Sequence, residues 1–231
     1  TVKGRAVPTE DAGVLHIERL ERVTSPDDYS NLFDTVPETW PVGRDLIDRA
    51  RARIHQLPRR LRQLFNAIFW DGQRFLRYLT GPRSIEHDQP DLNGNFRHGL
   101  DLVDRALALA EGDVMVYRGL IILGGVLLNA GKADHYQLHP TENRFVAVAS
   151  DPQGGPRTTS LEWLSLAKVM YQPTLPLEHY RTLSHMISDT WNSAAGYAVR
   201  ATLRREVALL AQAESVLKSS DMHAQPVGSS V

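Results

Sequence analysis

Histidine and carboxylate side chains are the residues of this chain that could support hydrolytic or metal chemistry. The 231-residue sequence holds nine histidines and no cysteine. Imidazole and carboxylate together suit zinc, iron, manganese or nickel, whereas thiolate zinc sites, cysteine nucleophiles and disulfides are excluded. No His-Glu-x-x-His motif occurs, and no glycine-rich loop leads into a Lys-Ser/Thr pair that would cradle phosphates. Any such chemistry must therefore come from a different arrangement.

Two segments combine chemically capable residues with helical patterns. The first is Gly94-Asn95-Phe96-Arg97-His98-Gly99-Leu100, which leads into a stretch with helical spacing. The second is an apolar stretch that ends in Leu127-Leu128-Asn129-Ala130-Gly131-Lys132. A polar loop with His87 and Asp88 precedes both segments, and two later helical stretches carry His185 and Glu214.

In their order and separation, these segments resemble the HD-domain superfamily of metal-dependent phosphohydrolases. The resemblance runs from Val14 to Leu217 and is closest to the HD-domain 3′–5′ exoribonucleases and the HD-type domain of MobH-type conjugative relaxases. In those families a histidine pair precedes a Gly-Gly-Leu-x-x-His segment. A buried helix then delivers Leu-Leu-His-Asp-x-Gly-Lys, and a late helix supplies a final Asp. The N-terminal stretch is similar to the end of the nucleic-acid-binding OB domain that precedes the exoribonuclease core.

The resemblance implies vestigial or weak metal ligands at His87, His98, His185 and Glu214. Its signature is altered, because Asn129 stands where the family has histidine and Ala130 where it has aspartate. In the superfamily this pair holds the metal, which must lower the pKa of bound water toward about 7. We therefore expect no catalytic residues and no cofactor, with Lys132 as a phosphate contact.

Each of these residues also has a purely structural interpretation. His98 could cap or pack the start of a helix, and His185 could be a hydrogen-bonded core histidine. Glu214 could be a carboxylate on a helix surface. Lys132 could satisfy carbonyl groups at a helix C-terminus.

Arginine is concentrated in one part of a chain whose net charge is −1. Residues 44–62 hold seven arginines against two aspartates. Such a segment could bind phosphates, with Trp70 and Tyr78 available to stack on single-stranded nucleic acid, or it could be a solvated helix face. The candidate nucleic-acid contacts are Arg51, Arg53, Arg59, Arg60 and Arg62.

The spacing of apolar residues predicts a mainly α fold. Helical patterns cover residues 44–57, 61–79, 100–110, 117–128, 161–170, 177–191 and 198–218, and residues 14–20 and 145–148 read as short strands. We expect an HD-domain-like helical bundle over residues 41–218. A small β or irregular appendage with a linker is expected at residues 1–40, and a flexible tail at 219–231.

Three functions follow from these patterns. The preferred one is a catalytically degenerate HD-fold protein that binds single-stranded nucleic acid, a nucleotide or a protein partner rather than hydrolysing. The second is an active metal-dependent phosphodiesterase or 3′–5′ exoribonuclease using manganese, nickel, iron or magnesium. The third is an accessory structural protein of a conjugative or integrative element. The absence of cysteine, of a signal-peptide pattern and of an apolar run near the roughly 20 residues that span a bilayer favours a cytoplasmic location without membrane contact.

Overall fold

Helices dominate the structure, a computed structural model that describes residues 2–8, 15–22, 25–27, 29–85, 91–139, 141–142, 144–148, 154–188 and 205–224. The elements in chain order are β1 (Val2–Pro8), β2 (Leu15–Arg22), the 3-10 helix η1 (Leu32–Thr35), α1 (Arg44–His55), α2 (Arg59–Ile68), α3 (Gly72–Thr80), α4 (Gly94–Leu109), α5 (Arg118–Leu127), α6 (Lys132–His135), β3 (Tyr136–Leu138), β4 (Phe145–Ala147), α7 (Pro156–Tyr171), α8 (Leu177–Ile187) and α10 (Arg205–Ala224). The mainly α prediction is confirmed. None of the described helices is long and apolar enough to cross a membrane.

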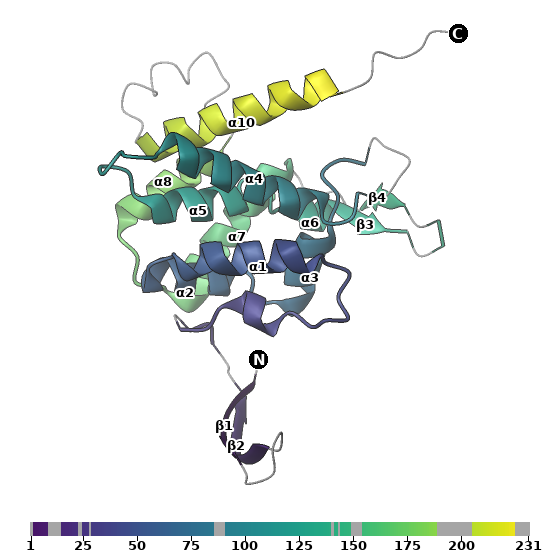
Figure 1. The fold of residues 1–231 in the computed structure, drawn as a ribbon, viewed down its shortest axis with the longest axis vertical. Helices are drawn as coiled ribbons and strands as arrows, with labels where there is room; N and C mark the ends of the chain where they lie inside the picture. The colour runs from purple at the N-terminus through teal and green to yellow at the C-terminus, as the bar shows by residue number, and fades with distance from the viewer. Residues whose placement is uncertain are drawn as a thin grey trace.

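The strands form two separate antiparallel hairpins, β1 with β2 and β3 with β4. In the second hairpin Tyr136 lies opposite Ala147, and Leu138 lies opposite Phe145. The strand predicted at residues 145–148 is therefore β4. Figure 1 shows α6 and this hairpin at one end of the helical bundle, and α10 runs toward the same end. It also shows β1 and β2 apart from the helices.

The helices α1 and α2 form where the apolar spacing predicts them. The buried face of α1 consists of Leu46, Ile47, Ala50 and Ile54. Pro58 is the residue immediately before α2. A proline inside a helix would remove a backbone hydrogen bond, so it separates the two helices instead.

The helix α5 lies at the centre of the core, and its residues from Gly119 to Leu127 are all buried. A Cβ atom at residue 124 would lie 2.3 Å from the Met186 sulfur, and one at residue 125 would lie 2.7 Å from a Val103 methyl group. Glycines at these positions let α8 and α4 pack directly against the α5 backbone.

The short helix η1 is part of the core of the helical body. The Phe33 ring is 2% exposed, and its centroid lies 5.8 Å from that of Phe65, 5.3 Å from that of Phe75 and 5.7 Å from that of Phe96. Such aromatic contacts bury large apolar areas. Residues before 41 therefore contribute side chains to the core of the helical body.

The C-terminal helix α10 runs to Ala224, past the start of the tail predicted at residue 219. The Ser219 hydroxyl donates to the carbonyl oxygens of Ser215 at 3.2 Å and Val216 at 2.9 Å. A serine that bonds back to its own helix need not end it. Residues 225–231 lie outside the described part of the chain.

Candidate phosphate-binding site

A tight corner between α5 and α6 places Lys132. The Gly131 amide donates a hydrogen bond to the Ser160 hydroxyl at 2.8 Å. A Cβ atom at residue 131 would lie 2.0 Å from the Pro156 carbonyl oxygen, well inside contact distance. Glycine is therefore needed for the corner to approach the first turn of α7, and this approach brings Lys132 near Arg157.

Side-chain hydrogen bonds hold α6 between α3 and α7. The Asp134 carboxylate accepts from the Arg77 guanidinium at 2.7 Å and from the Trp163 indole at 3.1 Å. The His135 Nε2 atom lies 2.9 Å from the Thr159 hydroxyl. Because α6 is held from both sides, the position of Lys132 at its first residue is well defined.

The Glu214 carboxylate lies between two cationic side chains. Arg157, in the first turn of α7, places Nη2 2.7 Å from Glu214 Oε1, and Lys218, one turn along α10, places Nζ 2.9 Å from the same oxygen. The side chains of Arg157 and Glu214 are 12% and 7% exposed, whereas that of Lys218 is 58% exposed. The arrangement thus extends from a buried ion pair to the surface.

Lys132 is the third cation near Glu214. Burial, together with the positive charges of Arg83, Arg157 and Lys218, lowers the pKa of Lys132 to about 8, although the negative charge of Glu214 acts to raise it. The Lys132 ammonium donates to the Arg83 backbone carbonyl. We call Arg83, Lys132, Arg157 and Lys218, together with Glu214, the basic cluster. It draws on the loop after α3 and on α6, α7 and α10.

The positions that correspond to metal ligands do not form a metal site in the part of the chain that the structure describes. Ala130 is fully buried and has no ligand atom, and the Glu214 carboxylate already binds two cations. His185 is exposed on α8, which rules out a core role, and His98 is buried on α4. His87 and Asp88 lie outside the described residues.

One buried acceptor near these positions is unused. Asn95, one turn before His98 on α4, donates through Nδ2 to the Asn129 carbonyl oxygen at 3.1 Å, while its own Oδ1 has no hydrogen-bond partner. An amide oxygen is a weak metal ligand, and a hydrolytic metal needs several stronger ones. Within the described residues no group of three or more histidine, cysteine or acidic side chains could hold a metal ion. Among the described residues, these positions therefore bring together no set of ligands for manganese, nickel, iron or magnesium.

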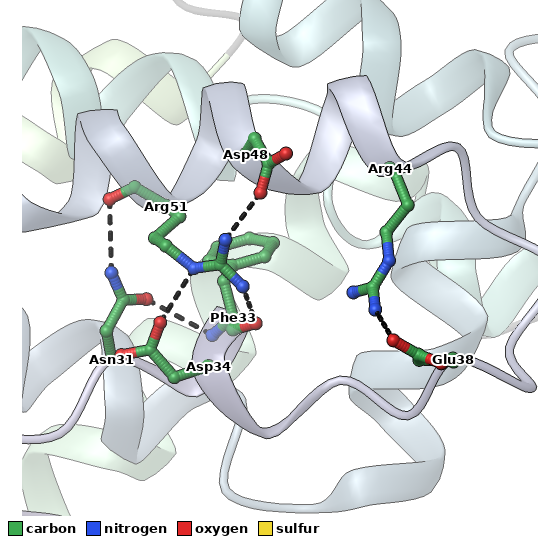
Figure 2. Close-up of polar contacts among 7 residues, drawn as sticks. All are labelled: Asn31, Phe33, Asp34, Glu38, Arg44, Asp48 and Arg51. Carbon is green, nitrogen blue, oxygen red and sulfur yellow. Dashed lines mark hydrogen bonds and ion pairs between the residues drawn. The ribbon is translucent and has the colours of Figure 1, made fainter.

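The arginine-rich stretch makes internal contacts that the local sequence does not show. Arg51 binds Asp34 at 2.7 Å as well as Asp48, and donates to the Phe33 carbonyl oxygen at 3.3 Å. Figure 2 shows how these contacts tie α1 to η1. Arg53 binds Asp104 on α4 at 2.7 Å. Both charges are thus already compensated within the protein.

The remaining candidate arginines lie at or near the start of α2. Arg62 donates to the carbonyl oxygens of His55 at 3.2 Å and Leu57 at 3.0 Å, so it closes the connection between α1 and α2. The Arg59 guanidinium lies 4.2 Å from the centroid of the Tyr29 ring, a cation–π contact. Arg60 is exposed. These positions leave a much smaller free cationic surface than the count of arginines implies.

Sequence reasoning identified Lys132 but missed its cationic neighbours Arg83, Arg157 and Lys218. Arg157 stood before the helix predicted from residue 161, outside any expected element, whereas α7 begins at Pro156. Proline at a first helical position is a usual start signal, so this boundary could have been found. The pairing of Arg157 with Glu214 spans 57 residues and leaves no local signal.

Comparisons with protein-family models, with curated proteins and with solved structures find no significant match to this chain.

Proposed function

We propose that this protein binds the phosphate of a nucleic acid or nucleotide at the basic cluster and does not hydrolyse it. The observation that carries the proposal is that Arg157 in α7 and Lys218 in α10 bind Glu214, and that Lys132 in α6 lies near enough for these charges to act on its pKa. Clustered lysine and arginine side chains are the usual protein ligands of phosphate. The start of α7 adds the positive end of a helix dipole on the same side as Arg157.

In this proposal the chain keeps the HD-domain scaffold that its sequence resembles, but the side chains at the metal-binding positions differ. In that reading Asn129 and Ala130 replace the metal-holding pair, while Lys132 retains the lysine that ends the motif. Glu214 takes the place of the final aspartate but binds Arg157 and Lys218. Cations of the protein then occupy the neighbourhood where the enzymes keep a metal, which favours anion binding over water activation.

A titration with a short fluorescent single-stranded oligonucleotide tests the proposal. Binding to each phosphate releases counterions, so log K should fall with log salt by about 0.7 per neutralised phosphate between roughly 50 and 200 mM salt. Competition by a mononucleotide distinguishes a nucleotide ligand from a longer nucleic acid. Lys218→Gln should weaken binding and flatten the salt slope, because the exposed Lys218 ammonium is the outermost cation of the cluster.

Arg181→Gln is the matched control for this experiment. Arg181 is exposed on α8 and lies outside the basic cluster, so its loss removes one positive charge from the surface without changing the proposed site. Affinity and salt slope should stay at the wild-type values. Equal effects of Lys218→Gln and Arg181→Gln would contradict a localised site, and the absence of binding at about 50 mM salt would contradict the proposed function altogether.

A further inference from the structure

We propose that the pocket between the C-terminal end of α7 and the start of α8 binds a carboxylate attached to a small apolar group, and that Lys168 and Gln172 hold the carboxylate. The inference is independent of phosphate binding at the basic cluster, since the two sites share no residue. It rests on the lining of the pocket, on its two available polar side chains and on the backbone conformation of Gln172.

The pocket is lined mainly by apolar side chains. Its volume is about 290 Å³, and its lining includes Pro173 and Leu175 from the connection after α7 and Leu177 and Tyr180 from the first turn of α8. The Tyr180 hydroxyl donates to the Pro173 carbonyl oxygen at 3.3 Å, which fixes the ring as one wall. Ligand sites are typically concave and apolar, with a few placed polar groups. Because an apolar cavity of about 150 Å³ can hold a benzene molecule, this pocket has room for a phenyl or short aliphatic group.

Lys168 supplies a positive charge at this pocket. Its ammonium nitrogen lies 4.6 Å from the centroid of the Tyr180 ring, and both residues line the pocket. Among the described residues no carboxylate binds Lys168. A cation–π contact orients an ammonium group but leaves its charge in place. A ligand carboxylate that enters beside the ring can therefore form a charge-assisted hydrogen bond with Lys168.

Gln172 has the left-handed backbone conformation that usually selects glycine. Its φ is 44°, and it directly follows α7, at a position where helices often end in glycine. Any other L-residue is unfavourable there, because its Cβ atom crowds the following carbonyl oxygen. Asn93 is the other non-glycine residue with positive φ in the described part of the chain, and it has a structural reason. Its side-chain amide donates to the carbonyl oxygens of Pro41 and Leu79, both at 3.0 Å.

No such bond explains the side chain of Gln172. Within the described residues its amide group has no hydrogen-bond partner, and it lines the same pocket as Lys168. Backbone strain of this kind is commonly kept where a side chain has a function. An amide N–H and an ammonium group four residues apart can donate to the two oxygens of one carboxylate. The single positive charge of Lys168 also matches the single negative charge of a carboxylate.

Titration of the protein with phenylpropionate, followed by NMR of the backbone amides, tests the inference. We expect shifts centred on residues 168–180 and a Kd in the millimolar range, since so small a ligand makes few contacts. The neutral analogue phenylpropanamide should bind at least about tenfold more weakly, because it carries no charge to pair with Lys168. A short peptide that ends in phenylalanine, with a free or an amidated C-terminus, distinguishes a peptide terminus from a free acid as the source of the carboxylate.

Two variants test the residues that hold the carboxylate. Lys168→Gln should weaken the binding of phenylpropionate at least about tenfold and remove its advantage over phenylpropanamide. Arg105→Gln is the matched control, because it removes an exposed cation from α4, and it should leave both values unchanged. Gln172→Gly should weaken binding by about three- to tenfold. It should also raise the urea midpoint of unfolding, since glycine adopts this conformation without strain.

Each result supports or overturns the inference. No binding of phenylpropionate or of the two peptides at about 10 mM would overturn it. Equal affinities for phenylpropionate and phenylpropanamide, or full affinity in Lys168→Gln protein, would overturn the choice of a carboxylate. A Gln172→Gly protein that is less stable than wild type, or that binds phenylpropionate with unchanged affinity, would overturn the role of Gln172. None of these results bears on phosphate binding at the basic cluster.

Discussion

Arg157 Nη2 lies 2.7 Å from Glu214 Oε1, and this ion pair joins the first turn of α7 to α10 with side chains that are 12% and 7% exposed. Two charges removed from water in this way must compensate each other, because desolvation of either alone is costly. The pair also explains why Glu214 is not a simple helix-surface carboxylate. Its oxygen binds two cations of the protein, so its role is to hold the basic cluster together.

Removal of one partner of this pair should destabilise the protein strongly. Glu214→Ala is expected to lower the free energy of unfolding by about 3–5 kcal/mol, because it removes the carboxylate that binds the buried Arg157 guanidinium. Arg157→Ala should cost less, because Lys218 still binds Glu214. The double variant Arg157→Met/Glu214→Met should lose much less than the sum of the two. Urea denaturation measures all three values.

An exposed ion pair on the same helix supplies the control. Arg205 on α10 binds Asp113 at 2.7 Å, but the two side chains are 63% and 32% exposed. Arg205→Ala should therefore change the free energy of unfolding much less than Arg157→Ala does. Equal losses for Arg157→Ala and Arg205→Ala would contradict the importance of the buried pair.

Gly131→Ala tests the corner that positions Lys132. The added methyl group would lie 2.0 Å from the Pro156 carbonyl oxygen, so the corner and α7 must move apart. We expect a loss of about 1–3 kcal/mol in the free energy of unfolding, together with weaker phosphate binding. Gly72→Ala is the control, because nothing lies within 4 Å of a Cβ atom at residue 72. A Gly131→Ala protein as stable as Gly72→Ala would show that the corner tolerates a side chain.

Local spacing in the sequence predicted the helices well, since Leu46, Ile47 and Ile54 all face the core as their periodicity required. The local spacing of residues does not predict ion pairs between distant segments. Residues 44–62 read as strongly basic because only Asp45 and Asp48 are near in sequence, yet Asp104 binds Arg53 from a position 51 residues away. The number of charged residues in a segment therefore does not give the charge exposed on its surface. For the same reason, the sequence did not reveal which charged residues lie near Lys132.

The contacts of Arg51 predict a structural role for that residue. Arg51→Ala removes the bonds to Asp34 and to the Phe33 carbonyl oxygen that tie η1 to α1 (Figure 2). Hydrogen bonds to charged groups contribute about 1.5–3 kcal/mol, and partial exposure of Arg51 reduces this to about 1–2 kcal/mol. Arg60→Ala, at an exposed position on α2, should stay within about 0.5 kcal/mol of wild type. Equal unfolding free energies for the two variants in urea would contradict this assignment.

The depressed pKa of Lys132 predicts how stability changes with pH. Its pKa falls from 10.5 to about 8, mainly through burial. Between these pH values the unfolded chain holds a proton that the folded protein has released, so the contribution of Lys132 to the free energy of unfolding rises with pH. The stability of wild type minus that of Lys132→Met should therefore increase from pH 8 to pH 10.5, by on the order of 3 kcal/mol.

The comparison with Lys132→Met isolates the contribution of Lys132 to the pH dependence of stability, because all other lysine and tyrosine side chains are present in both proteins. The measurement is urea denaturation of the two proteins at several pH values across that window. A difference that is flat or falls with pH would mean that Lys132 is solvated in the folded protein. The basic cluster would then be more open than the structure indicates.

Measurements of metal content and of hydrolysis distinguish most directly between the proposed phosphate-binding protein and the alternative, an active phosphodiesterase. We expect elemental analysis of the purified protein to find no stoichiometric transition metal. Bis-p-nitrophenyl phosphate should not turn over with added manganese or nickel, because Ala130 supplies no ligand and Glu214 is held by Arg157 and Lys218. Stoichiometric metal with turnover that His98→Ala abolishes and His185→Ala preserves would place a working metal site at α4. The cations around Glu214 would then act on the substrate of an enzyme, since positive charge next to a metal can still bind the phosphate that the metal attacks.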